Sequence, residues 1–129
     1  MAFLSTLVSC TLGDDNSTNY HFEILPVDSV DIPDEFVLGE TYPITVHYTK
    51  PSGCYVFNDF YYVKELNERT VAVIATVYED QACTQATEPS EATFNFMVNS
   101  NGSYVFKFWQ GEDESGNDIY YIVEVPVTE

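Results

Sequence analysis

Three cysteines are the residues with the most specific chemistry in this chain, Cys10, Cys54 and Cys83. A thiol can form a disulfide, carry a lipid or belong to a redox pair, and its spacing and surroundings decide between these roles. Cys54 and Cys83 lie at the open ends of two stretches rich in β-branched and aromatic residues, 54–66 and 69–79. These stretches predict a hairpin that turns at residues 66–69, centred near Glu68. A disulfide could close its base with little backbone movement.

A redox role is the alternative for this pair. It would require closer spacing, such as Cys-x-x-Cys, and a positively charged neighbour, whereas Asp59, Glu79 and Asp80 make the region acidic. We therefore interpret Cys54 and Cys83 as a structural disulfide, worth about 3 to 4 kcal/mol in the chain-entropy model. It indicates an oxidising compartment and leaves Cys10 as the odd cysteine.

The remaining candidate residues give no catalytic signature. His21 and His47 are the only histidines, and each is on the polar side of a predicted strand without the ligand spacing of zinc or copper sites. No GxSxG turn occurs, so we predict no catalytic residue, no enzyme activity and no cofactor. Asp113 and Asp118, in the acidic loop 112–118, have the oxygen ligands that Ca²⁺ prefers but not the EF-hand spacing. We favour a solvated hairpin tip without metal and keep calcium as the alternative.

Short alternating runs of apolar and polar residues must position these side chains. They predict an all-β fold, and the 129 residues suffice for one domain. Turn signals every 8 to 14 residues separate seven to eight antiparallel strands, which is typical of a β-sandwich. The predicted strands are 20–25, a short edge segment within 26–35, 41–49, 54–66, 69–79, 92–98, 103–109 and 119–127.

The charge of the chain limits its partners. The sequence has 21 acidic residues against 4 Lys and Arg residues, a formal net charge of −17. Such a chain repels phosphate backbones and anionic headgroups, which excludes nucleic acid as a partner. An acidic surface also keeps an extracellular domain in solution, and this is the interpretation we prefer over cation binding.

One sheet face carries a candidate binding surface. If Phe106 points into the core, Lys107 and Trp109 point away from it, beside Tyr120 and Ile122 of the next strand. An apolar, aromatic stripe on the solvent side of a sheet often marks a binding site. We predict that these four residues contact a protein or glycan partner. The alternative is that the N-terminal crossing at residues 26–35 or a second copy of the chain covers them.

The segment Leu7-Val8-Ser9-Cys10 resembles the lipobox of bacterial lipoproteins. The resemblance implies that Cys10 is lipidated, so that the membrane is reached through a lipid. Residues 1–9 would then be a signal peptide remnant, residues 10–19 the lipid anchor and a flexible tether, and residues 20–129 the folded domain.

The segment Gly102-Ser103-Tyr104-Val105-Phe106 resembles the tyrosine corner of immunoglobulin-like domains. It implies an immunoglobulin-like β-sandwich, although the usual cysteine pair between the sheets is missing. Together with the lipobox, this arrangement is similar to small immunoglobulin-like lipoproteins of Bacteroidetes-type bacteria. That similarity implies an outer-membrane anchor with the domain in the periplasm or on the surface.

These observations predict a non-enzymatic, lipid-anchored binding or accessory module of the cell envelope. One alternative is a structural or assembly lipoprotein that acts through self-association or a protein partner. An extracellular protease inhibitor is another, because immunoglobulin-like folds present loops that such an inhibitor could use.

Overall fold

The computed structural model describes residues 19–129, so the predictions for Cys10, the signal peptide remnant and the tether lie outside the described residues, Asn19 apart. Residues 19–129 contain no helix, and hence none that could span a membrane. They form ten strands: β1 (Tyr20–Leu25), β2 (Val27–Asp31), β3 (Phe36–Val37), β4 (Thr41–Lys50), β5 (Tyr55–Glu65), β6 (Glu68–Tyr78), β7 (Glu88–Met97), β8 (Tyr104–Glu112), β9 (Asp118–Val125) and β10 (Val127–Thr128).

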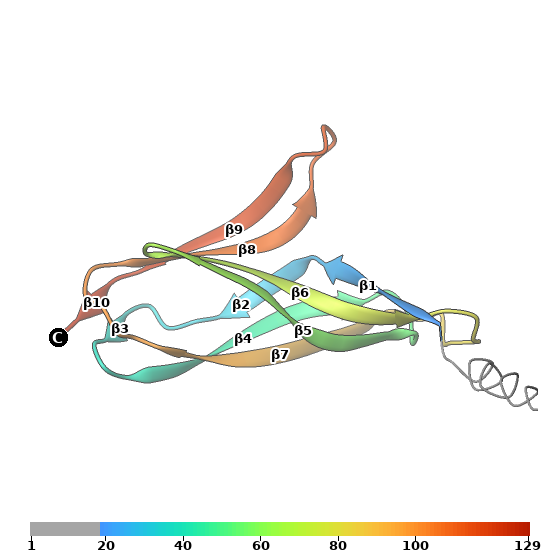
Figure 1. Ribbon diagram of the computed structural model, residues 1–129, viewed down its shortest axis with the longest axis horizontal. Coiled ribbons are helices and arrows are strands. Elements are labelled where there is room, and N and C mark those ends of the chain that lie inside the picture. The colour runs from blue at the N-terminus through green and yellow to red at the C-terminus, as the bar shows by residue number, and fades with distance from the viewer. Residues whose placement is uncertain (1–18) are drawn as a thin grey trace, which may run out of the picture.

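The strands form an open β-sandwich, as predicted (Figure 1). In the five-stranded sheet, β6 pairs with β5 along one edge and with β8 and β1 in succession along the other, and β8 also pairs with β9. The second sheet has the strand order β2-β4-β7. Eight strands have five or more residues, which agrees with the predicted number, and β3 and β10 form a separate short pair.

The expectation that all strands run antiparallel was wrong at two places. β6 pairs with β8 in parallel over Glu68–Val71, and β3 pairs with β10 in parallel. The chain reaches β8 from β7 of the other sheet and not by a hairpin from β6. Parallel strands require such a crossing connection, and sequence alternation carries no information about it.

The core lies between the inner faces of the two sheets. Ile44 and Val46 of β4 are buried there in one cluster with Val71, Val73 and Ala75 of β6. Aromatic rings fill the end near the C-terminus, where the Phe96 ring centroid lies 4.9 Å from that of Tyr104 and 5.1 Å from that of Phe106. Burial of these rings and β-branched side chains supplies the main driving force for folding.

Tyr104 fixes the connection that crosses from β7 to β8. Its ring is buried, and its hydroxyl oxygen accepts hydrogen bonds from the backbone N–H groups of Asn99 at 3.3 Å and Ser100 at 3.2 Å. The start of β8 is thereby attached to the segment that leaves β7.

β7 begins earlier than the sequence predicted. It starts at Glu88 and not at residue 92, because Glu88 and Pro89 pair with Lys50 and Thr49 of β4. Pro89 is compatible with this pairing because β7 is an edge strand, where a missing N–H can face solvent.

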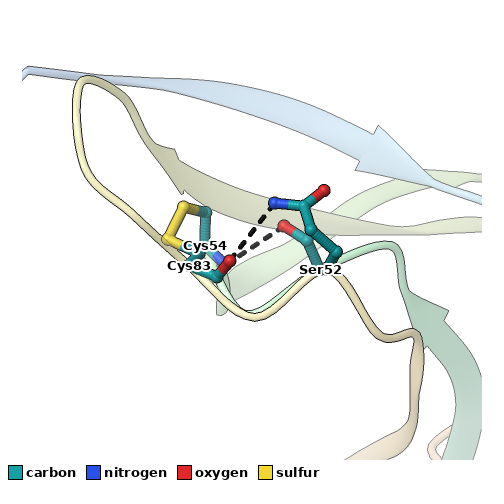
Figure 2. Close-up of a disulfide and its surroundings, with 4 residues drawn as sticks. Ser52, Cys54 and Cys83 are labelled. Atoms are coloured by element: carbon teal, nitrogen blue, oxygen red, sulfur yellow. Dashed lines mark hydrogen bonds between the residues drawn. A yellow bond between two sulfur atoms is a disulfide. The ribbon is translucent and has the colours of Figure 1, made fainter.

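The β5–β6 hairpin and its disulfide are present as predicted. The strands are joined at Leu66–Asn67, one to two residues before the predicted centre, and Leu66 has a φ of 56°. Cys54 and Cys83 form a disulfide with their Cα atoms 5.4 Å apart (Figure 2). The Gly53 N–H donates to the Thr84 carbonyl at 2.8 Å beside the bridge. The loop after β6 is thus attached to the start of β5 by one covalent and one hydrogen bond.

A variant with Cys54→Ala and Cys83→Ala should lose about 3 to 4 kcal/mol of unfolding free energy, because the bridge no longer restricts the unfolded chain. Urea unfolding of the oxidised protein and of the variant measures the difference. The reduced wild-type protein is the control and should match the variant. Equal midpoints for the oxidised protein and the variant would contradict a stabilising role.

Candidate functional site

The four residues of the predicted binding surface lie on one face of the five-stranded sheet. Trp109 of β8 is directly opposite Tyr120 of β9, and Lys107 is opposite Ile122. The Lys107 Nζ lies 5.0 Å from the centroid of the Tyr120 ring, within range of a cation–π interaction. The Trp109 Nε1–H donates to the Asp118 Oδ1 at 3.0 Å, which holds the indole in one orientation.

The hairpin that carries these residues projects beyond the second sheet. β8 and β9 rise away from the other strands toward their turn (Figure 1). Tyr121 is on the inner side of β9, 6.5 Å from the Phe108 ring, yet it is 45% exposed. The outer part of the hairpin therefore has no opposing sheet to bury its inner side.

The N-terminal strand extends the surface instead of covering it. Tyr20, Phe22 and Ile24 of β1 face outward, and Phe22 is 57% exposed. The polar residues His21 and Glu23 take the inner side of the strand. Leu25 explains this direction, because it is buried in the core and side chains alternate strictly along a strand.

Together these side chains form a broad surface that we call the aromatic face. It crosses all five strands of the larger sheet, since Tyr61 is opposite Ala72 and Thr70 is opposite Lys107. Its members are Tyr20, Phe22 and Ile24 of β1, Val56, Tyr61 and Val63 of β5, Ile74 of β6, Lys107 and Trp109 of β8, and Tyr120 and Ile122 of β9. The sequence predicted only the part on β8 and β9. The alternation in β1 was the signal for the rest, but it did not show which side faces the core.

A hollow of about 480 Å³ lies within the aromatic face. It opens where β8 leaves β6, because this pairing ends at Val71 and the pairing of β6 with β1 begins at Val73. Its lining residues are Ile24, Tyr61, Thr70, Ala72, Trp109, Glu112, Asp118 and Tyr120. Burial, followed by the charge of Asp118, raises the pKa of Tyr120 above its ordinary value.

The outer surface of the three-stranded sheet is different in character. The Thr45 and Thr93 hydroxyls lie 2.8 Å apart, and the Thr49 hydroxyl donates to Asp28 at 2.7 Å. His47 and Asp31 lie 2.8 Å apart on the same surface, which we call the polar face. Apolar exposure is therefore concentrated on one of the two sheets.

The histidines and the acidic loop form local interactions. A hydrogen bond to Glu23 is the main cause of a raised pKa at His21, and a hydrogen bond to Glu79 is the second cause. A hydrogen bond to Asp31 raises the pKa of His47. No group of three or more possible ligands among His, Cys, Asp and Glu is arranged for a metal within residues 19–129.

The two calcium candidates each make other contacts. The Asp113 carboxylate accepts hydrogen bonds from the backbone N–H groups of Asn117 and Ser115, which lower its pKa. Asp118 accepts the bond from Trp109. The acidic loop thus closes its own turn and orients the indole.

Fold and surface define the class of protein, a β-sandwich domain with an exposed aromatic sheet face. Residues 44–127 match the model of the ORF11 beta-sandwich domain family, and the chain belongs to this family. The match runs from within β4 to β10, so that β1 lies before it. No curated protein and no solved structure matches the chain.

The raised pKa of His21 predicts a stability that depends on pH. Its folded-state pKa lies above the unfolded value of about 6.5, so the contribution is complete below about pH 6.5 and is lost as the pH rises through the folded-state pKa. NMR titration of the ring should give the raised pKa, and urea unfolding at pH values below and above it should show the loss of this contribution to stability.

The variant Glu79→Gln should lower the His21 pKa toward its ordinary value and weaken this pH dependence. Glu114→Gln is the matched control, because Glu114 makes no ion pair with either histidine. A His21 pKa at or below about 6.5 in the wild-type protein would refute the role of the two carboxylates.

Proposed function

We propose that this protein is a non-enzymatic, lipid-anchored binding module of the cell envelope that contacts a protein partner through its aromatic face. The observation that carries the proposal is the concentration of exposed aromatic and aliphatic side chains on one sheet. Phe22 and Ile122, at its two sides, are 57% and 59% exposed. Exposed apolar patches of this extent commonly mark protein interaction sites.

The composition of the face supports a protein partner over a glycan. Aliphatic side chains such as Ile24, Val63 and Ile122 lie between the rings, and they give a glycan no hydrogen bonds. The hollow beside Trp109 has the form of a receptor for one anchoring side chain of a partner. Its carboxylates, Glu112 and Asp118, favour an anchor with a donor group or a positive charge.

The proposed location is supported by the segment Leu7-Val8-Ser9-Cys10 and by the disulfide. A disulfide persists in the oxidising compartments where exported proteins reside. A single lipid chain binds a membrane only weakly, so stable anchoring at Cys10 would require more than one chain. The folded domain would then stand off the membrane at the end of residues 10–19.

A photo-crosslinking amino acid placed at Ile122 in the producing cell should give a covalent adduct with the partner. The same amino acid at Thr93, on the polar face, is the matched control and should give none. Adding Trp109→Ala to the protein that carries the crosslinker at Ile122 should reduce the adduct strongly, because loss of an aromatic anchor costs about 2 kcal/mol, roughly thirtyfold in affinity.

The mass of the adduct identifies the kind of partner. The expected result is an adduct with a different protein, and a crosslinked dimer of this chain would instead establish the structural or assembly role. Adducts of equal yield at Ile122 and Thr93 would exclude the aromatic face as a selective surface. The Trp109→Ala protein should keep the wild-type melting temperature, because Trp109 is not part of the buried core.

A separate test concerns the anchor. Replacing the thiol in Cys10→Ser should move the protein from the membrane fraction to the soluble fraction and remove the lipid mass from its N-terminus, as mass spectrometry would show. Ser9→Ala keeps a small residue before the cysteine and should remain anchored. Membrane retention of Cys10→Ser would contradict lipidation at this position.

A further inference from the structure

A second recess lies between the two sheets, away from the aromatic face. It is a groove of about 490 Å³ between β5 and β7. Each of these strands has a partner on one edge only within residues 19–129, so both present free backbone groups beside the groove. Its apolar lining is formed by Phe60, Tyr62, Phe94, Phe96 and Met97, and its polar lining by Asp59, Lys64, Arg69, Asn95 and Asn99. The groove and the hollow of the aromatic face share no lining residue.

Arg69 is a buried cation in this groove. Its side chain is only 4% exposed, and one guanidinium nitrogen donates to the carbonyls of Leu66 and Glu68, both at 2.9 Å. The guanidinium carbon lies 5.6 Å from the Phe96 ring centroid and 5.1 Å from that of Tyr104. These contacts hold the group in a fixed plane.

No carboxylate neutralises Arg69. Within residues 19–129 it forms no ion pair, although the chain has 21 acidic residues. Its Nε and second terminal nitrogen donate to no carbonyl or carboxylate oxygen of this part of the chain. Its further polar neighbour is the Tyr62 hydroxyl, with which it forms a side-chain hydrogen bond. Arg69 and Tyr62 both line the groove.

The surroundings reinforce the positive charge. Lys64 of β5 is directly opposite Arg69 of β6, so two of the four Lys and Arg residues of the chain line this groove. Burial raises the pKa of Tyr62, and the Arg69 charge beside it partly opposes that rise. Buried charges in proteins are normally paired, and the planar arginine fork matches a carboxylate in two parallel hydrogen bonds. The missing counter-charge at this end of the groove is thus one that a ligand can supply.

We infer that the groove binds a peptide segment whose carboxylate is held by Arg69 and Lys64. The apolar side chains of the peptide would pack on Tyr62, Phe94 and Phe96, and its backbone would lie beside the free edges of β5 and β7. The carboxylate can come from the C-terminus of the peptide or from an acidic side chain. Asp59 is at the other end, since its partner Ile74 is five residues along β6 from Arg69, about 17 Å away.

Three peptides test this inference by NMR titration of the full-length, ¹⁵N-labelled protein. The first is N-acetyl-Phe-Leu-Phe with a free C-terminal carboxylate, the second is its C-terminal amide, and the third is N-acetyl-Phe-Leu-Glu-amide. The free acid should shift the backbone signals of Tyr62, Phe94 and Phe96 and bind about tenfold or more tightly than the amide. Binding of the third peptide at the level of the first would show that a side-chain carboxylate serves as well as a C-terminal one, and binding at the level of the second would restrict recognition to the C-terminus.

Variants locate the charge that is responsible. Arg69→Met should reduce the affinity for the free acid about tenfold or more and abolish the preference over the amide. Since Arg69 is buried, a variant at the exposed Lys64 provides the second test. Lys64→Gln should reduce the affinity for the free acid a few-fold and leave the folded structure intact. Lys50→Gln removes the same charge outside the groove and should leave the affinity unchanged.

Equal affinities for the free acid and both amidated peptides would overturn the inference, as would the absence of binding at millimolar concentration. An undiminished affinity of Lys64→Gln, together with a folded Arg69→Met that binds the free acid as the wild type does, would do the same. Because the groove is separate from the aromatic face, Trp109→Ala should bind the peptides normally. The two proposals can therefore fail independently.

Discussion

The structure depends on how β6 shares its edges. One edge pairs with β5 along the whole hairpin, whereas the other pairs with β8 at its start and with β1 further on. Two strands that approach one edge in succession must separate from each other, and the hollow of the aromatic face forms at this separation. The same arrangement lets the β8–β9 hairpin diverge from the three-stranded sheet opposite it (Figure 1). The buried Tyr104 lies at the start of β8, where its hydroxyl attaches this strand to the crossing from β7.

The two outer surfaces and the open side of the sandwich differ in their chemistry. On the polar face, hydroxyl and carboxylate groups satisfy one another, as Thr45 does with Thr93. On the aromatic face the exposed side chains are apolar, and the hydrogen bond from Trp109 to Asp118 orients a ring instead of hiding it. On the open side, Arg69 is held by rings and carbonyls without a counter-charge. The proposed binding sites lie on the aromatic face and on the open side for this reason.

The sequence predicted much of this protein. Its alternation predicted the β-sandwich. The bridge between Cys54 and Cys83 could be predicted because both lie at the base of one hairpin, where pairing is local. The placement of Lys107, Trp109, Tyr120 and Ile122 on one face followed from the twofold period of β8 and β9. All of these features depend on neighbours along the chain or across a single turn.

Only the tertiary structure decided how distant strands combine. Alternation in β1 shows two faces, but burial of Leu25 against the core selects the outward direction of Tyr20, Phe22 and Ile24. The parallel pairing of β6 with β8 and the early start of β7 arise from contacts between segments far apart in sequence. In the sequence, Arg69 belongs to the predicted turn at residues 66–69. In the structure it is a buried cation, because the rings of Phe96 and Tyr104 pack against its guanidinium group. Sequence period fixes what a strand presents on each side, whereas packing between sheets fixes which side is buried.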